Sequence, residues 1–376
     1  MQDNLCTIYK LAFNQLFQCL LANGYHGTQH PSEANILIVG VCASFEADEK
    51  RSLEAIAALS QYGKPLYVIG CMVSTLPRAL DTYRKTFRSW EYSELLDEVT
   101  PNCQIPLESI SLPSTFRCTE DYRVNDPTKH YVGICFGCAY ACSYCLHKIG
   151  AGNLVSRPQV EIIDQIQTLA GNGTKTIVLT GIDTASYGKD IGSSFSSLMG
   201  TILTRSQEGI KFHIAQYNPE EINKTASCNH MVNICSDPKV VDLQLPIQTT
   251  SSRLLGLMNR HYTSDTIEDF VIKVLLVNPG LFLRTDIIVG FPTETESEFL
   301  DTVAFVARYF KEVAVYRYEH KLCTPINKLG LPLLSRTIVD RRMEQAYRIL
   351  RNSNVLVHSG GQDIDSLMWS DQRKRH

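Results

Sequence analysis

Three cysteines in one short loop are the residues with the clearest capacity for chemistry. Cys138, Cys142 and Cys145 lie within eight residues of one another, directly after the apolar stretch Tyr131–Cys135. Thiolates this close together can wrap around one metal centre. On a four-iron cluster, three thiolates leave one iron without a protein donor, and a small molecule with amino and carboxylate groups can bind there.

Two other interpretations also fit the residues of this loop. Zinc binds thiolates, and His147 is available as the fourth ligand that zinc usually takes. Alternatively, the three cysteines are small buried hydrophobic residues. The loop follows a strand, at the edge where α/β folds bind their ligands, and this position favours a catalytic centre.

Residues 128–335 carry the repeating pattern that places this loop. Six apolar stretches of strand length are separated by helical patterns: Tyr131–Cys135, Thr176–Thr180, Lys211–Ala215, Val240–Ile247, Leu281–Phe291 and Val313–Tyr318. Six βα units around a parallel sheet predict a partial (β/α)6 barrel rather than a complete eight-stranded one. Residues 336–376 are expected to form a last amphipathic helix, Arg336–Arg351, followed by a tail without a clear pattern.

Residues 1–100 predict a separate, small α/β domain. Helices are expected over Leu11–Asn23 and Glu49–Tyr62, and strands over Ala34–Val41 and Pro65–Gly70. Residues 101–127 contain four prolines and no sustained periodicity, which indicates a linker.

Composition restricts where the protein works and how it uses its thiols. The start of the chain lacks the pattern of a secretion signal and no apolar run is long enough to span a membrane, so a cytoplasmic protein is expected. Reducing compartments favour metal or catalytic use of the thirteen cysteines over disulfides. The net charge of −3 gives no global basic field for nucleic acid. Scattered cysteines are interpreted as buried apolar residues: Cys19, Cys103, Cys118, Cys228 and Cys235.

The spacing Cys-x3-Cys-x2-Cys, with Tyr144 before the last cysteine, resembles the signature of the radical S-adenosylmethionine (SAM) superfamily. The resemblance implies that the open iron chelates the methionine part of SAM. An electron from the cluster then cleaves SAM to a 5′-deoxyadenosyl radical, which abstracts hydrogen from an unactivated carbon. Tyr144 matches the residue that packs near the adenine.

Further motifs are similar to the radical SAM methylthiotransferases (MiaB/RimO-like) over nearly the whole chain. They are Leu179–Asp190, Leu245–Gln248 with Met258–Tyr262, and Thr285–Thr295. Glycines and polar residues recur where the predicted strands end, which allows a ligand to approach the backbone closely. Gly181, Asp183 and Gln248 are therefore candidates for SAM binding. The alternative is that they are ordinary turn and helix-capping residues.

The same resemblance implies a second 4Fe-4S cluster in the N-terminal domain, on Cys6, Cys42 and Cys71. Cys42 and Cys71 each follow a predicted strand, so their thiols are expected at equivalent strand ends of one sheet. The family implies that this auxiliary cluster donates the sulfur. One SAM methylates that sulfur, and a second SAM yields the radical that activates the substrate carbon. Three unrelated buried thiols are the alternative.

Several positions depart from the family pattern. Leu5 precedes Cys6 where the family usually has glycine, and Thr293 replaces the second glycine of Gly-Phe-Pro-Gly-Glu-Thr. Lys321–Thr324 replaces Arg-x-Gly-Thr and leaves Cys323 unexplained. Family members end in a small β-rich TRAM module that holds tRNA or a ribosomal protein, and only 25 residues, Asn352–His376, stand in its place.

The resemblance implies methylthio transfer to an unactivated C–H bond, and the missing module and the net charge favour a peptide or protein side chain as the substrate. The alternative substrate is a modified adenosine in tRNA, with Lys148, Arg157 and Arg253 as candidate phosphate or substrate contacts. A third possibility is an iron-sulfur protein for electron transfer or sulfur storage without radical chemistry. The expected partners are the substrate and a flavodoxin- or ferredoxin-type reductant, with no membrane.

Overall fold

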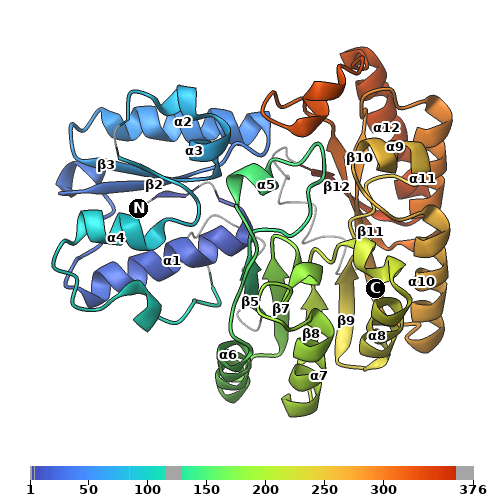
Figure 1. Cartoon of the computed structure of the whole chain (residues 1–376), viewed down its shortest axis with the longest axis horizontal. Coiled ribbons are helices and arrows are strands. Elements are labelled where there is room, and N and C mark those ends of the chain that lie inside the picture. Colours follow the sequence, from blue (N-terminus) through green and yellow to red (C-terminus); the bar gives the residue numbers. More distant parts are fainter. Residues whose placement is uncertain (1, 4, 84, 116–128, 361–376) are drawn as a thin grey trace.

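The computed structural model describes residues 2–3, 5–83, 85–115 and 129–360, and it contains two sheets side by side (Figure 1). The N-terminal sheet is parallel, in the order β1-β2-β3-β4. Its strands are β1 (Gln2–Asp3), β2 (Leu37–Val41), β3 (Leu66–Gly70) and β4 (Thr86–Phe87). Helices of the same module are α1 (Thr7–Ala22), α2 (Glu46–Ser60), α3 (Cys71–Thr75) and α4 (Tyr92–Val99).

Helices cover both faces of this small sheet, which explains the continuous apolar runs of β2 and β3. Val39 packs in one core with Ile56 of α2, whereas Ile38 packs in another with residues of α1 and α4. Strands that are buried on both faces need apolar residues at every position. The module therefore forms as the sequence predicts, with α1, α2, β2 and β3 close to their predicted limits.

The second sheet is the predicted partial barrel. Its order is β12-β11-β10-β9-β8-β7-β5-β6, and all neighbours pair in parallel except β5 and β6. The strands are β5 (Lys129–Phe136), β6 (Val155–Ser156), β7 (Thr176–Gly181), β8 (Lys211–Ile214), β9 (Val240–Gln244), β10 (Phe282–Val289), β11 (Glu312–Arg317) and β12 (Leu356–Gly360). All six predicted strands are present.

Helices cover the outer face of the barrel, and their apolar sides share one core with the sheet. The long helices are α6 (Gln159–Gly171), α7 (Phe195–Arg205), α8 (Thr225–Ser236), α10 (Ser264–Val277), α11 (Glu296–Tyr309) and α12 (Arg336–Asn352). Two short helices, α5 (His147–Gly150) and α9 (Ser252–Leu257), lie in the loops that follow β5 and β9.

Strand β12 is a correction to the patternless tail expected after α12. It extends the barrel by one strand and pairs in parallel with β11. Its residues, Leu-Val-His-Ser-Gly, give no strong strand signal, because only two of them are apolar and the last is glycine, which is depleted in strands. Cys118 and residues 361–376 lie outside the described residues. The predicted domain limits stay predictions.

The N-terminal module packs on the barrel along α1, which lies against β5 and β7, and it is attached at two further places. On one side α3 packs against α5, and Tyr9 Oη donates a hydrogen bond to Ala151 O at 3.0 Å. On the other side the Glu46 amide donates to Glu319 Oε2 at 2.6 Å, and the rings of Phe45 and Tyr316 stack 5.5 Å apart. The module thus reaches from the loop after β5 to the loop after β11.

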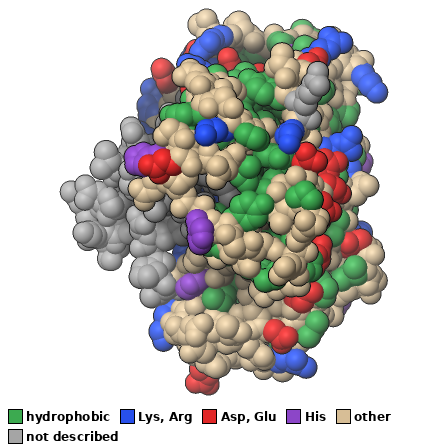
Figure 2. All heavy atoms as spheres, turned by 90° about the vertical axis from the view of Figure 1, so that its left-hand side faces the viewer, with side chains coloured by type: hydrophobic (Ala, Val, Ile, Leu, Met, Phe, Trp, Pro, Cys, Tyr) green, Lys and Arg blue, Asp and Glu red, His purple; other side chains and the backbone are tan. Residues whose placement is uncertain are grey.

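The outward face of the N-terminal module mixes apolar and charged side chains (Figure 2). Lys and Arg side chains are scattered over this face rather than gathered in one place. Within the module as a whole, the exposed large apolar residues are Leu21, Tyr62 and Trp90. In the described part of the chain, no helix combines the length and apolar character needed to cross a membrane.

Gly70 is the last residue of β3, directly before Cys71, and it provides a test of how this strand positions the cysteine. Its φ of 143° suits glycine, and a Cβ there would lie 2.1 Å from the carbonyl oxygen of Val41. We expect Gly70→Ala to lower the free energy of unfolding by more than about 3 kcal/mol, because strain and a backbone clash add. Chemical denaturation measures this. Gly200→Ala in α7 meets open space and should stabilise by up to about 1 kcal/mol; equal effects of the two changes would refute the assignment.

Candidate active site

The cysteine loop after β5 is held by the backbone of neighbouring segments. The Ser143 amide donates a hydrogen bond to Met258 O at 2.9 Å, and Ser143 O accepts one from the Ile326 amide at 2.9 Å. Asn259 Nδ2 donates to Ala141 O at 2.8 Å. Residues from two different places in the chain, Met258–Asn259 and Ile326, therefore hold the loop in its shape.

The three cysteines of this loop each face a charged or titratable side chain. Cys138 Sγ lies 3.7 Å from Asp183 Oδ2, and Cys145 Sγ lies 3.7 Å from His147 Nδ1. Burial raises the pKa of Cys138 above its usual range, and the Asp183 carboxylate adds to the rise. Burial alone would raise the pKa of Cys145, but the hydrogen bond and charge of His147 bring it below its usual value.

Cys142 faces Arg260, a residue of the motif Met258–Tyr262 to which the sequence alone gave no role. Arg260 Nη1 lies 3.9 Å from Cys142 Sγ, and Nη2 donates at 3.0 Å both to Asn218 Oδ1 and to Pro246 O. The residue is only 7% exposed, and within the described residues its Nε has no hydrogen-bond partner. Burial raises the pKa of Cys142 to about 11 even though the Arg260 charge opposes it. The only sequence signal was that Arg260 lies within a motif, Met258–Tyr262, that resembles the family.

Asp183 follows β7 and lies beside the cysteine loop. Its Oδ1 accepts from the Ala185 amide at 3.1 Å, and Oδ2 accepts from Ser186 Oγ at 2.5 Å. It therefore caps a helical turn and also faces Cys138. Burial raises its pKa, which these hydrogen bonds oppose.

The other predicted SAM contacts have clear local roles. Tyr144 packs edge-to-face against Phe291 with ring centroids 6.3 Å apart. A Cβ on Gly181 would lie 2.8 Å from Cys135 Sγ, so glycine is needed there for packing. Gln248 is buried and bridges to Ile287 of β10. Contact with SAM stays a prediction for all of them.

Four non-glycine residues with left-handed backbone lie in the loops at the carboxyl ends of the barrel strands. They are Gln216 (φ 52°), Gln248 (φ 62°), Asn259 (φ 55°) and Thr293 (φ 67°). Such conformations cost free energy and persist only where the surroundings impose them, and functional sites are where they concentrate. Their positions mark this edge of the barrel as the candidate active site.

Cys6, Cys42 and Cys71 come together in the N-terminal module, as predicted. Cys71 Sγ lies 3.6 Å from Cys42 Sγ, and hydrogen bonds from Cys6 and then Cys71 lower the pKa of Cys42 well below its usual value. Cys42 and Cys71 follow neighbouring parallel strands, so their thiols emerge at the same edge. Cys6 reaches them from the residue before α1.

The two trios of cysteines are close neighbours. Helix α5 begins two residues after Cys145 and packs on α3, which begins at Cys71. A Cβ on Gly150 would lie 2.5 Å from Cys71 Cβ. His147 is within electrostatic reach of both Cys145 and Cys42; burial lowers its pKa, but these thiols raise it overall to about 9.

The donor sets suit iron-sulfur clusters. Each trio supplies three thiols from one partly buried place, the ligand type that 4Fe-4S clusters use. Among the described residues, no group of three His, Cys, Asp or Glu is arranged to hold a single metal ion. None of the twelve described cysteines forms a disulfide, and Cys323 is exposed beside Leu322, which is 83% exposed.

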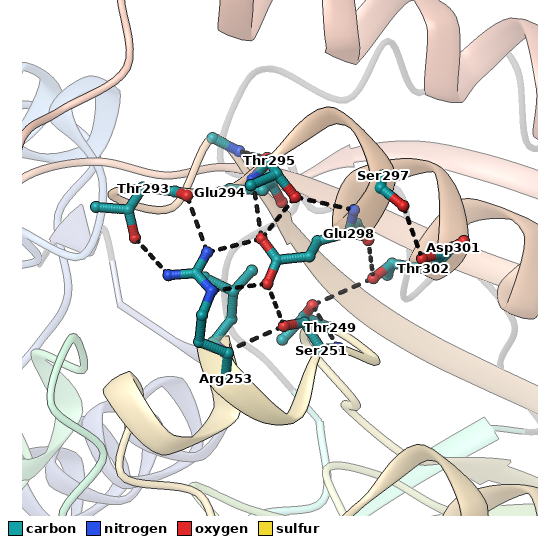
Figure 3. A network of polar contacts seen from close by, with 12 residues as sticks. Thr249, Ser251, Arg253, Thr293, Glu294, Thr295, Ser297, Glu298, Asp301 and Thr302 are labelled. Carbon is teal, nitrogen blue, oxygen red and sulfur yellow. Dashed lines mark hydrogen bonds and ion pairs between the residues drawn. The ribbon is translucent and has the colours of Figure 1, made fainter.

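The candidate phosphate contacts already have partners inside the protein. Lys148 Nζ donates to Cys138 O at 2.8 Å, and Arg157 Nη1 donates to Gly133 O at 2.6 Å. Arg253 is held by Glu298, with Nη2 to Oε2 at 2.7 Å (Figure 3). Lys148 therefore lies at the cysteine loop, whereas Arg157 and Arg253 are bound to other groups of the protein.

The turn after β10 contains a buried ion pair. Arg342 Nη1 donates to Glu294 Oε2 at 2.8 Å, and Glu294 Oε2 also accepts from the Gly290 amide at 2.9 Å. The side chains of Arg342 and Glu294 are 5% and 2% exposed. Burial raises the pKa of Glu294 to about 7, although both partners oppose the rise.

Comparison with known proteins agrees with this geometry. Residues 132–306 match the model of the radical SAM superfamily, and residues 6–90 match that of the uncharacterized protein family UPF0004. A radical SAM methyltransferase from Kitasatospora setae, TsrM, has the same fold with a TM-score of 0.61 at 15% identity, over 86% of this chain and 76% of that one. The fold and the cysteine loop thus define a radical SAM protein.

Its curated relatives are methylthiotransferases. The threonylcarbamoyladenosine tRNA methylthiotransferase MtaB of Bacillus subtilis is 28% identical over 86% of this chain and 74% of its own. A probable threonylcarbamoyladenosine tRNA methylthiotransferase of Methanocaldococcus jannaschii is 30% identical, over 76% and 66%. The ribosomal protein uS12 methylthiotransferase RimO of an Anaeromyxobacter strain is 28% identical, over 82% and 67%. The chain belongs to the radical SAM methylthiotransferase family, whose cofactors are SAM and 4Fe-4S clusters.

The Glu294 carboxyl predicts a pH dependence of stability. Because its folded pKa of about 7 lies above its ordinary value of 4.5, stability is full below about pH 4.5 and falls as the pH rises through 7. We expect wild-type protein to lose about 3 kcal/mol over this range that Glu294→Gln does not lose. Denaturant unfolding at several pH values measures the difference. Parallel pH profiles of the two proteins would contradict the assignment.

Proposed function

We propose that Cys138, Cys142 and Cys145 hold the 4Fe-4S cluster that binds SAM, and that Cys6, Cys42 and Cys71 hold an auxiliary 4Fe-4S cluster. The packing of α5 on α3 carries this proposal, because it places the two trios next to each other across the candidate site. When bound, the first cluster with SAM supplies the radical, and the second supplies sulfur. The reaction is methylthio transfer to an unactivated carbon.

The residues of the chain then have separate tasks. Arg260 places a buried positive charge beside Cys142, and Asp183 places a carboxylate beside Cys138. If SAM binds at this loop, these opposite charges would complement its carboxylate and amino groups. Tyr144 and Phe291 form an apolar wall next to the loop, which keeps water from the reacting atoms.

The substrate that we propose first is an adenosine derivative in tRNA. The support is that relatives matching 86% and 85% of this chain, from Bacillus subtilis and Clostridioides difficile, are tRNA methylthiotransferases by name. The polypeptide favoured by the sequence analysis is the second candidate. It is supported by the net charge of −3 and by the scattered Lys and Arg side chains in Figure 2, because tRNA binding usually needs a basic surface. The cytoplasmic location and the flavodoxin- or ferredoxin-type reductant stay predictions.

Single cysteine changes separate the two proposed clusters. Cys142→Ala should abolish cleavage of SAM to 5′-deoxyadenosine, whereas Cys71→Ala should spare cleavage and stop methylthio transfer. Anaerobic reconstitution should give about eight irons per chain in the wild type and about four when Cys138, Cys142 and Cys145 are all replaced, because each trio holds one four-iron cluster.

Cys228→Ala is the matched control, because this buried thiol lies on α8 in the barrel core. It should retain both clusters and both activities. Methylthio transfer by the Cys71→Ala protein would disprove the role of the auxiliary cluster. About four irons in the wild type would leave a single-cluster enzyme.

Salt dependence distinguishes the two substrate classes. Binding that rests on phosphate contacts releases counterions, so affinity for an unmodified tRNA transcript should fall more than about tenfold between about 50 and about 200 mM salt. Fluorescence anisotropy of labelled tRNA measures this. Weak tRNA binding with little salt dependence, together with methylthio transfer to a peptide, would favour the polypeptide.

A further inference from the structure

Thr293 adopts a backbone conformation that a β-branched residue rarely takes. Its φ is 67°, in the left-handed region that favours glycine. It lies in the turn between β10 and α11, after Gly290, Phe291 and Pro292. Such a residue is strained unless its surroundings impose the conformation.

Arg253 supplies the contacts that hold Thr293 in this conformation (Figure 3). Its Nη1 donates to Thr293 Oγ1 at 2.9 Å, and its Nη2 donates to Thr293 O at 2.9 Å. One guanidinium thus binds both the side chain and the backbone of the strained residue. Its planar fork suits two fixed acceptors better than a lysine would.

Glu298 fixes the guanidinium in turn. Its Oε1 accepts from Arg253 Nε at 3.0 Å, and Oε2 accepts from Nη2 at 2.7 Å. Glu298 also completes the capping box of α11, because it accepts from the Thr295 amide at 2.9 Å. Ser251 Oγ donates to Glu298 Oε1 at 2.6 Å. Arg253 is therefore anchored to the first turn of α11 as well as to the turn before it.

The helix that carries Arg253 also holds the cysteine loop. Helix α9 spans six residues, and Arg253 is its second. At its other end, Leu257 O accepts from Ser143 Oγ at 2.6 Å and Met258 O accepts from the Ser143 amide at 2.9 Å. A short, hydrogen-bonded helix transmits a displacement of one end to the other. The turn at Thr293 and the cysteine loop are thus joined through α9.

The turn reaches the same loop by a second route. Phe291, two residues before Thr293, is fully buried and packs edge-to-face against Tyr144, which lies between Cys142 and Cys145. Tyr318 packs on the other side of Phe291 with ring centroids 5.2 Å apart. A shift of the turn would therefore move the aromatic wall beside the cysteines.

We propose that Arg253 and Glu298 act as positioning residues for the SAM site by holding Thr293 in the left-handed conformation. The proposal rests on the proposed function, because it takes the cysteine loop as the place where SAM binds. It extends that function by giving a task to an arginine that does not contact the loop itself. The proposal also explains a consequence of having threonine at position 293, where the family pattern has glycine. The left-handed backbone is strained for threonine, so the chain needs Arg253 to hold it.

The test is a double-mutant cycle between Arg253→Ala and Thr293→Gly. Without Arg253, the strained threonine relaxes and the turn moves, so the melting temperature of the cluster-free protein should fall by about 3 °C. Adding Thr293→Gly should restore most of this loss, because glycine adopts a φ of 67° at no steric cost. Thr293→Ala should not restore it, because alanine keeps the strain.

Kinetics of SAM cleavage distinguish positioning from mere stability. In the reconstituted enzyme, Arg253→Ala should raise KM for SAM roughly tenfold and leave kcat for 5′-deoxyadenosine formation within about twofold, because a displaced wall weakens ground-state binding. Thr293→Gly should bring KM back in the double variant. Arg336→Ala, an exposed arginine on α12, is the matched control and should change neither quantity.

The outcomes separate this proposal from the proposed function. A double variant that is no more stable than Arg253→Ala alone would overturn the role of strain, and an unchanged KM in Arg253→Ala would overturn the positioning role. If the wild type fails to cleave SAM, the proposed function falls, whereas the melting temperatures of the cluster-free proteins still decide whether Arg253 holds Thr293.

Discussion

The contact between α5 and α3 is the constraint on which the rest of the site depends. It presses Gly150 against Cys71 and thereby brings two separately built trios of thiols to one place. Neither trio needs the other in order to form, since one follows β5 of the barrel and the other follows parallel strands of the N-terminal sheet. Chemistry that combines a radical with a sulfur donor requires both within reach of one substrate atom. A direct helix contact secures this without relying on a flexible linker.

Parallel strands explain why each trio assembles at all. Their carboxyl ends meet at one edge of a sheet, so residues far apart in the chain arrive there together. Cys42 and Cys71 use the neighbouring strands β2 and β3, and Asp183 arrives beside Cys138 from β7. The N-terminal module is attached a second time at the loop after β11, where Glu319 accepts from the Glu46 amide. Together with the packing of α1 against β5 and β7, these attachments keep the module against the barrel.

Charge and strain are both concentrated at this edge. Arg260 lies buried against Cys142 although burying an arginine is costly, and residues in left-handed conformation recur in the loops around it. Buried charges elsewhere in the barrel are paired, as for Asp242 of β9 with Arg284 of β10, and the helices pack on the strands through an apolar core. An energetically unfavourable local conformation that many surrounding contacts stabilise is typical of a ligand-binding site.

The sequence by itself determined the six barrel strands, the small N-terminal module and the loop of three cysteines, because strand periodicity and close thiol spacing are local signals. Cys6, Cys42 and Cys71 are scattered along the chain, and only the resemblance to the methylthiotransferases singled them out. The sequence could not predict β12, whose pairing depends on an edge of β11 that only the folded barrel offers. Nor could it predict the proximity of the two trios, the burial of Arg260 or the clamp of Arg253 on Thr293. These rest on contacts between residues distant in the chain, and only tertiary packing decides which of many possible partners a side chain meets.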